Sequence, residues 1–147
     1  MHWALGQNDP EGWSTSGQTL DEEAHALVRI CDYAFKTHLD RYKYPNRYDL
    51  ANGLADREAG SAYLDQLNTK LMQSKFLMGA KWSWVDAAVA PFVRQFARTD
   101  RVWFDAQAWT PLQNWLTQFE QSESFIAVMH RYKIWYAGAR PVAFPPD

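Results

Sequence analysis

A polar pair directly before an apolar run limits what the middle of this chain can form. In Ser83-Trp84-Val85-Asp86, the Ser83 hydroxyl can accept a hydrogen bond from the backbone N–H of Asp86, and the Asp86 carboxylate can accept one from the N–H of Ser83. This reciprocal arrangement, a capping box, predicts the start of a helix. No charged residue follows from Ala87 to Val93, and a helix that is apolar nearly all round lies at the centre of a domain.

An active-site role for the same pair is the alternative. It would require a base or a nucleophile close by, and the side chains between Ser83 and Asp86 are Trp and Val. We therefore predict that both residues form a structural N-cap, whose loss typically costs about 0.5–2 kcal/mol. Pro91 lies within the same helix and is expected to bend it.

Apolar residues recur at steps of three and four along most of the chain, which is the period of helices with one buried face. The first such stripe runs from Leu20 to Leu39, with Thr19 or Asp21 as its cap, and is expected to end before Pro45. The other predicted helices cover residues 54–73, the segment after Ser83, and residues 111–121 and 124–131. No run of β-branched residues alternates with polar ones, so the sequence predicts an all-α bundle of about five to six helices.

The amino-acid composition is that of a folded globular protein. Apolar residues make up 47% and aromatic residues 16% of the 147 positions, which is far from the composition of disordered chains. The formal charge is −2, so we expect neither nucleic acid nor a membrane as a partner. One cysteine excludes an internal disulfide and fits a cytoplasmic location.

The two ends differ from the middle. "MHWALG" reads as the last turns of a helix, which would be marginal alone. The proline-rich "ARPVAFPPD" predicts an extended C-terminal tail over residues 138–147.

The stretch "FLMGAKWSWVDAAVAPFVRQF" resembles the central helix of the glutathione S-transferase C-terminal domain, which the family writes as Leu or Phe, Gly, then Ser/Thr-x-x-Asp and an apolar run. The order of the predicted helices matches that domain over nearly the whole chain. "HLDRYKYPNRY" and "FVRQFARTDRVWFD" are similar to an uncharacterised bacterial branch of the family.

This resemblance implies that a thioredoxin-like N-terminal domain, which binds glutathione and activates its thiol, is missing from the chain. Residues 1–12 are then a remnant of that domain's last helix with a linker, and residues 13–147 are the helical substrate domain. We expect no catalytic residue and no cofactor here, with glutathione as co-substrate of the parent family only. Each unit by which a thiol pKa is lowered needs about 1.4 kcal/mol of thiolate stabilisation, so the chain should be inactive alone.

The resemblance also implies a second-substrate pocket on the first long helix, on the side away from its apolar stripe. The substrate-binding residues expected there are Asp32, Tyr33, Lys36, Asp40, Arg41 and Tyr44. Lys36 and Arg41 could meet a carboxylate, and Tyr33 could stack or donate. The alternative is that these side chains only solvate the exposed face of the helix.

Other candidate sites have a structural interpretation. The basic and aromatic run "DRYKYPNRY" favours a surface loop over nucleic-acid binding. Cys31 and His38 share the apolar stripe and are expected to be an inert buried thiol and a paired core histidine. The histidines at 2, 25, 38 and 130 have no metal-ligand spacing, so no metal site is predicted.

Three functions remain open at this point. The first is the substrate domain of a truncated transferase, with a thioredoxin-like domain in cis or in trans, a small electrophilic or hydrophobic substrate, and a homodimer favoured by exposed Trp3, Trp13 and Tyr33. The second is a non-catalytic protein-interaction module, like the helical docking units of translation factors and aminoacyl-tRNA synthetase complexes. The third is a complete ligand-binding helical protein.

Overall fold

The computed structural model describes residues 2–14, 18–129 and 131–142. Its elements, in chain order, are α1 (His2–Gln7), α2 (Gln18–Ile30), the π-helical η1 (Cys31–Phe35), α3 (Lys36–Lys43), the 3-10 helical η2 (Pro45–Tyr48), α4 (Leu54–Gln73), α5 (Trp84–Thr99), α6 (Arg101–Asp105), α7 (Thr110–Glu120) and α8 (Glu123–Val128). Extended pairing within the described residues is limited to one bridge between Phe76 and Gly79. The all-α prediction is therefore confirmed, and the elements after α1 agree with the expected bundle if α2, η1 and α3 count as one rod.

That rod explains the apolar stripe of the first helix. An α-helix turns about 100° per residue, so residues four apart drift by roughly 40° around the axis. The wider i→i+5 turn of η1 takes up part of this drift. Leu27, Cys31, Phe35 and Leu39 consequently all stay buried, with at most 2% of each exposed.

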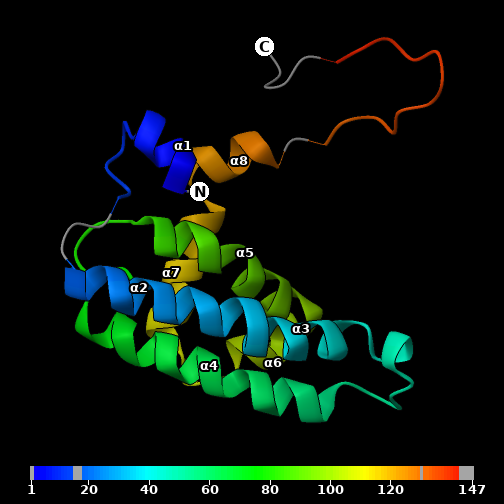
Figure 1. Ribbon diagram of the computed structural model, residues 1–147. Helices are drawn as coiled ribbons and strands as arrows, with labels where there is room; N and C mark the ends of the chain where they lie inside the picture. The colour runs from blue at the N-terminus through cyan, green and yellow to red at the C-terminus, as the bar shows by residue number, and fades with distance from the viewer. Residues whose placement is uncertain (1, 15–17, 130, 143–147) are drawn as a thin grey trace.

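The helices pack around α5. In Figure 1 the α2–α3 rod runs between α4 below it and α5 above it, and α7 packs against both α4 and α5. The buried face of α5 contributes Val85, Val89, Val93 and Phe96 to the core, each no more than 1% exposed. The central position expected for this helix is confirmed.

The capping box before α5 is present as predicted. The Asp86 carboxylate accepts from the backbone N–H of Ser83 at 3.0 Å, while the Ser83 side chain receives the N–H of Asp86. Gly79 precedes it with φ of 126°, a conformation that favours glycine, in a turn where Phe76 and Gly79 exchange backbone hydrogen bonds. The helix continues through Pro91 to Thr99, with the proline on its exposed side.

The first and last segments that the structure describes lie at one end of the bundle. Both α1 and α8 lie above the other helices, and residues 131–142 continue away from the bundle as an extended segment (Figure 1). Residues 138–142 agree with the predicted tail, whereas 143–147 lie outside the described residues. The assignment of residues 1–12 to a neighbouring domain stays a prediction.

Candidate functional site

A mainly apolar pocket of about 450 Å³ opens where α5, the end of α7, α8 and the loop after α1 meet. Its lining residues are Trp13, Ala87, Pro91, Arg94, Gln95, Phe119, Ser124, Phe125, Val128 and Met129. Ligand pockets in proteins typically measure roughly 300–1,000 Å³ and combine apolar walls with a few polar groups. This pocket meets both criteria.

Local sequence holds Trp13 at the mouth of the pocket. Asp9-Pro10-Glu11-Gly12 carries the residues that favour a type I turn, and the N–H of Gly12 donates to the carbonyl of Asp9. The Asp9 carboxylate accepts from the N–H of Trp13 at 2.7 Å and from that of Ser14 at 2.9 Å. These backbone hydrogen bonds, that of Ser14 first, lower the pKa of Asp9. The carbonyl of Trp13 also accepts from the N–H of Trp84, so the loop is tied to the first turn of α5.

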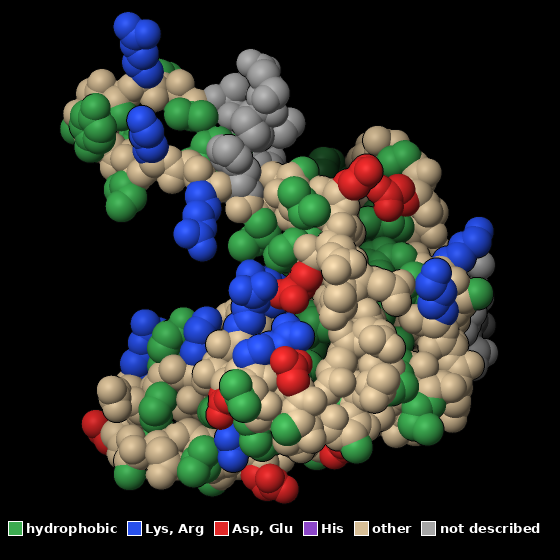
Figure 2. Space-filling view, turned by 180° about the vertical axis from the view of Figure 1, so that it is seen from behind, with side chains coloured by type: hydrophobic (Ala, Val, Ile, Leu, Met, Phe, Trp, Pro, Cys, Tyr) green, Lys and Arg blue, Asp and Glu red, His purple; other side chains and the backbone are tan. Residues whose placement is uncertain are grey.

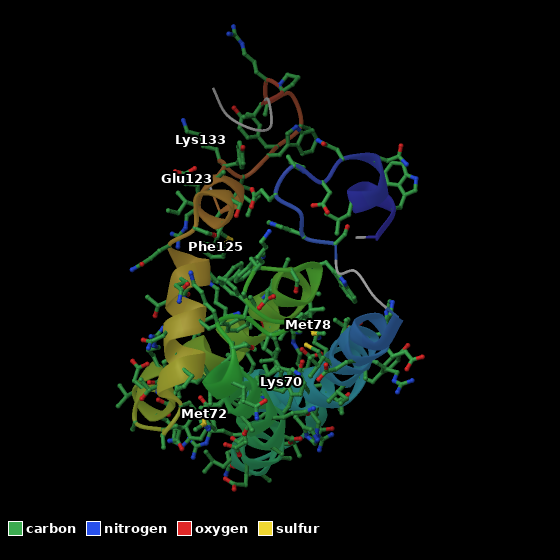
Figure 3. All side chains as sticks on the ribbon, turned by 90° about the vertical axis from the view of Figure 1, so that its left-hand side faces the viewer. Lys70, Met72, Met78, Glu123, Phe125 and Lys133 are labelled. Atoms are coloured by element: carbon green, nitrogen blue, oxygen red, sulfur yellow. The ribbon has the colours of Figure 1, made fainter. Side chains whose placement is uncertain are left out.

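A row of aromatic rings extends from the pocket residues Phe119 and Phe125 toward the core of the bundle. Trp82 stacks on Trp115 with ring centroids 6.1 Å apart and on Phe119 at 5.8 Å. Phe119 in turn contacts Phe125, at 4.6 Å. Figure 3 shows Phe125 between α8 and the bundle. The row connects the pocket to the core, because the Trp115 indole donates to Asp86.

A cluster of arginines borders the pocket around Glu120. Arg94 donates from Nε to Glu120 Oε1 at 3.1 Å, and Arg98 donates to the same oxygen at 2.9 Å. Arg101 lies 3.6 Å from Oε2 of Glu120 and forms a closer pair with Asp105 at 2.8 Å. The Arg94 guanidinium also stands 5.1 Å from the centre of the Phe125 ring, which places a cation against the apolar wall.

The six substrate-binding residues predicted from the first helix are not gathered in this pocket. Asp32 and Tyr33 line an open hollow of about 590 Å³ on the surface of α2 and η1, together with Arg29. Lys36 is paired with Asp40 one turn away. Their role in substrate binding stays a prediction.

The remaining two predicted site residues lie near the end of α3. Arg41 donates from Nε to both oxygens of Asp56 at 3.1 Å, so its charge is already matched by a carboxylate. Tyr44 is covered by Arg47, whose guanidinium lies 4.1 Å from the ring centre. The surface loop predicted for this run is wrong in part, because its first four residues form the last turn of α3 and Pro45–Tyr48 form η2. Tyr42 faces the core and is 7% exposed, while Arg47 contacts the Tyr44 ring as an aromatic packing partner.

Asp56 was not anticipated from the sequence. It accepts from Arg41 and lies 2.9 Å from Nδ1 of His38, so it joins α3 to the first turn of α4. His38 has the expected partner, but its side chain is 36% exposed and is not a core residue. Burial would raise the pKa of Asp56, yet hydrogen bonds from His38 and Arg41 outweigh it and lower that pKa.

Two further candidates have structural surroundings. Asp86 is fully buried, and its pKa is raised because the loss of water outweighs its hydrogen bonds. Cys31 is 1% exposed, and burial raises its pKa to about 12, which confirms the inert thiol. Within residues 2–14, 18–129 and 131–142, no group of three or more His, Cys, Asp or Glu side chains could hold a metal ion. Nor does this part of the chain contain a helix long and apolar enough to cross a membrane.

The pocket residues Trp13, Phe119, Phe125 and Met129 were also missed as site residues. Two sequence signals could have found these residues. Phe119, Phe125 and Met129 are apolar positions of the predicted helices at 111–121 and 124–131, and Trp13 follows a turn sequence. Neither signal indicates that these segments face one another.

Comparison with known proteins gives one match. The family model for the glutathione S-transferase C-terminal domain matches residues 51–118, from the residues before α4 into α7. No curated protein and no solved structure matches the chain.

Proposed function

We propose that this chain is the helical second-substrate domain of a glutathione S-transferase-like protein. The match of residues 51–118 to the glutathione S-transferase C-terminal domain supports this proposal. The pocket between α5, α8 and Trp13 takes a small apolar molecule. The observation that carries this proposal is the apolar lining of that pocket. The helix α5, which lies inside the family match, contributes Ala87 and Pro91 to it, and Phe119 and Phe125 add aromatic rings from α7 and α8.

The fit to an apolar ligand follows from the lining. Pro91, Phe119, Phe125 and Met129 offer ring and thioether surfaces, which favour flat organic molecules over sugars or ions. Trp13 adds an indole whose N–H donates to Glu11, and the Trp13 backbone is held by hydrogen bonds to Asp9 and from Trp84. A ligand there would be covered by surfaces that are already in position, so little ordering would oppose binding.

In this proposal a separate domain, and not the helical chain, binds glutathione and activates its thiol. A thioredoxin-like domain, in cis or in trans, would bind glutathione and lower its thiol pKa, whereas Cys31 is buried and protonated at neutral pH. The 147 residues alone should therefore give no heat of glutathione binding by titration calorimetry. Micromolar affinity would mean that this chain holds a glutathione site of its own.

A fluorescence titration with anilinonaphthalene, a neutral apolar probe, tests the pocket itself. Ala87→Phe fills the pocket from α5 and should abolish most of the fluorescence rise. Ala26→Phe, the matched change in the hollow on α2, should leave the titration unchanged. Equal binding by wild type and Ala87→Phe, with both variants folded by circular dichroism, would contradict the proposed pocket.

A specific observation also supports a protein-interaction module as the second candidate. Ile134, Trp135 and Tyr136 follow one another in the C-terminal segment and are 93%, 71% and 70% exposed. Apolar surface of this kind commonly marks protein contacts. Light scattering should then show association that Trp135→Ser weakens and that Trp3→Ser, at another exposed tryptophan, does not. Monomers at all concentrations would count against self-association through this segment.

A further inference from the structure

We propose that the pocket selects apolar molecules that carry one anionic group, with Arg94 as the residue that contacts the anion. This inference rests on the proposed function and adds the charge of the ligand to it. A carboxylate or sulfonate attached to an aromatic body is the chemistry that the site fits.

The charge of the lining is the first observation. Arg94 is the charged residue among those that line the pocket, and the lining includes no carboxylate from the described residues. Its side chain is only 20% exposed and lies against the Phe125 ring, so its position is restricted. The hydrogen bond to Glu120 uses Nε, one of the five N–H donors of a guanidinium group.

Glu120 does not balance the cations around it. Arg94 and Arg98 both donate to the same oxygen, Glu120 Oε1. Arg101 also approaches Glu120, but it has a second carboxylate, Asp105, at 2.8 and 2.9 Å. The two guanidinium groups of Arg94 and Arg98 therefore share one carboxylate, which leaves a positive charge beside the apolar wall.

Lys43 adds to this charge from α3. Its ammonium group donates to the neutral amide oxygen of Gln95 at 3.3 Å, and Gln95 lines the pocket. Figure 2 shows Lys and Arg side chains gathered in the middle of the back face, with a few carboxylates among them. Because the whole chain has a formal charge of −2, this positive field is local to the site.

An anion would form stronger hydrogen bonds in this pocket than on a fully hydrated protein surface. Guanidinium donors form charge-assisted hydrogen bonds with carboxylate and sulfonate oxygens, and these are stronger where water is partly excluded. The Phe125 ring lies against the Arg94 guanidinium, and the Arg94 side chain is 20% exposed, so this side of the cation has little contact with water. A neutral ligand contacts only the apolar walls. The difference in affinity between an anionic and a neutral ligand therefore measures the contribution of Arg94.

Two probes with the same rings separate these contributions. Anilinonaphthalenesulfonate differs from neutral anilinonaphthalene by one sulfonate group. We expect Arg94→Gln to weaken the sulfonate about tenfold and to leave the neutral probe within about twofold of wild type. Arg29→Gln removes the same charge from the hollow on α2 and should change neither affinity.

A second variant guards against misfolding. Arg98 is 55% exposed, so Arg98→Gln should fold even if Arg94→Gln does not, and it should weaken the sulfonate by about two- to fivefold. Arg94→Lys keeps the charge and should recover part of the sulfonate affinity.

Each outcome decides one of the two proposals. If Arg94→Gln and Arg98→Gln change the ratio of the two dissociation constants less than about twofold, the charge selectivity is wrong while the apolar pocket stands. A sulfonate loss in Arg29→Gln instead would place the anion on α2 and would also overturn it. If neither probe binds to wild type, the proposed function itself fails.

Discussion

The indole N–H of Trp115 donates a hydrogen bond of 2.8 Å to Oδ1 of Asp86, 29 positions earlier in the chain. The same oxygen accepts the N–H of Leu77 at 3.0 Å, and Oδ2 accepts the N–H and the hydroxyl of Ser83. One buried carboxylate thus joins the turn before α5, the start of α5 and the middle of α7. This connection also fixes the aromatic row beneath the pocket.

Replacing Asp86 should therefore cost more than removing an ordinary helix cap. Asp86→Ala leaves the donors of Leu77, Ser83 and Trp115 without their acceptor in the core, and we expect at least about 3 kcal/mol of lost unfolding free energy. Ser83→Ala should cost about 0.5–2 kcal/mol. Urea denaturation measures both, with exposed Glu58→Ala on α4 as the control. Similar small losses for both variants would show that the connection to α7 is unimportant.

Acid stability should depend on Asp56. Its pKa is lower in the folded state, so the stabilisation that it gives is present above its unfolded pKa, near 4, and is lost as the pH falls through the folded value. The difference in unfolding free energy between wild type and Asp56→Asn should be largest near neutral pH and shrink below about pH 4. A difference that is constant across this range, measured by urea denaturation, would rule out the titration of Asp56 as its cause.

Asp86 should show the opposite pH dependence. Its pKa is raised by burial, so its contribution is fully present below its unfolded pKa and is lost as the pH rises through the folded value. Asp86→Asn should therefore lose less stability, relative to wild type, at neutral pH than near pH 4. The same urea series tests this, and a larger loss at neutral pH would contradict it.

Gly53 should not tolerate a side chain. A Cβ atom at this position would lie 2.5 Å from the Cα and the carbonyl oxygen of Tyr42, where the start of α4 passes the end of α3. Because backbone must move to make room, Gly53→Ala should destabilise the protein by about 1–3 kcal/mol. Gly6→Ala, which has open space around it, should leave the melting temperature unchanged. Equal melting temperatures for the two variants would mean that the loop moves freely.

Cys31 should react slowly in the native protein. It is 1% exposed, and its pKa is raised to about 12, so both access and thiolate content are low. A disulfide reagent at mildly alkaline pH should modify it at least about 100-fold more slowly than in denaturant. Rapid reaction without denaturant would indicate that the α2–α3 rod opens easily.

Features set by neighbouring residues could be predicted from the sequence. The capping box depends on Ser83 and Asp86 three positions apart, and both its presence and the start of α5 are confirmed. The bounds of α4, Leu54–Gln73, also agree with the apolar period. The π-helical η1 was not predicted, because its residues have the same step-of-four pattern as an α-helix.

Features that depend on distant residues could not be predicted in the same way. Trp115 and Asp86 occupy separate predicted helices, and no local pattern pairs them. Arg41 looked available for a substrate carboxylate until Asp56, fifteen positions later, proved to be its partner. The pocket itself needs Trp13 and Met129 together, from opposite ends of the described chain.

The central claim is that an apolar ligand binds between α5, α8 and Trp13. Its most direct test is a ¹H–¹⁵N NMR titration of the isotope-labelled protein with anilinonaphthalene. The account predicts the largest shifts at the Trp13 indole and at the amides of Phe125 and Met129, with little change at Arg29 and Tyr33. The largest shifts at Arg29 and Tyr33 instead would place the ligand on α2 and contradict the account.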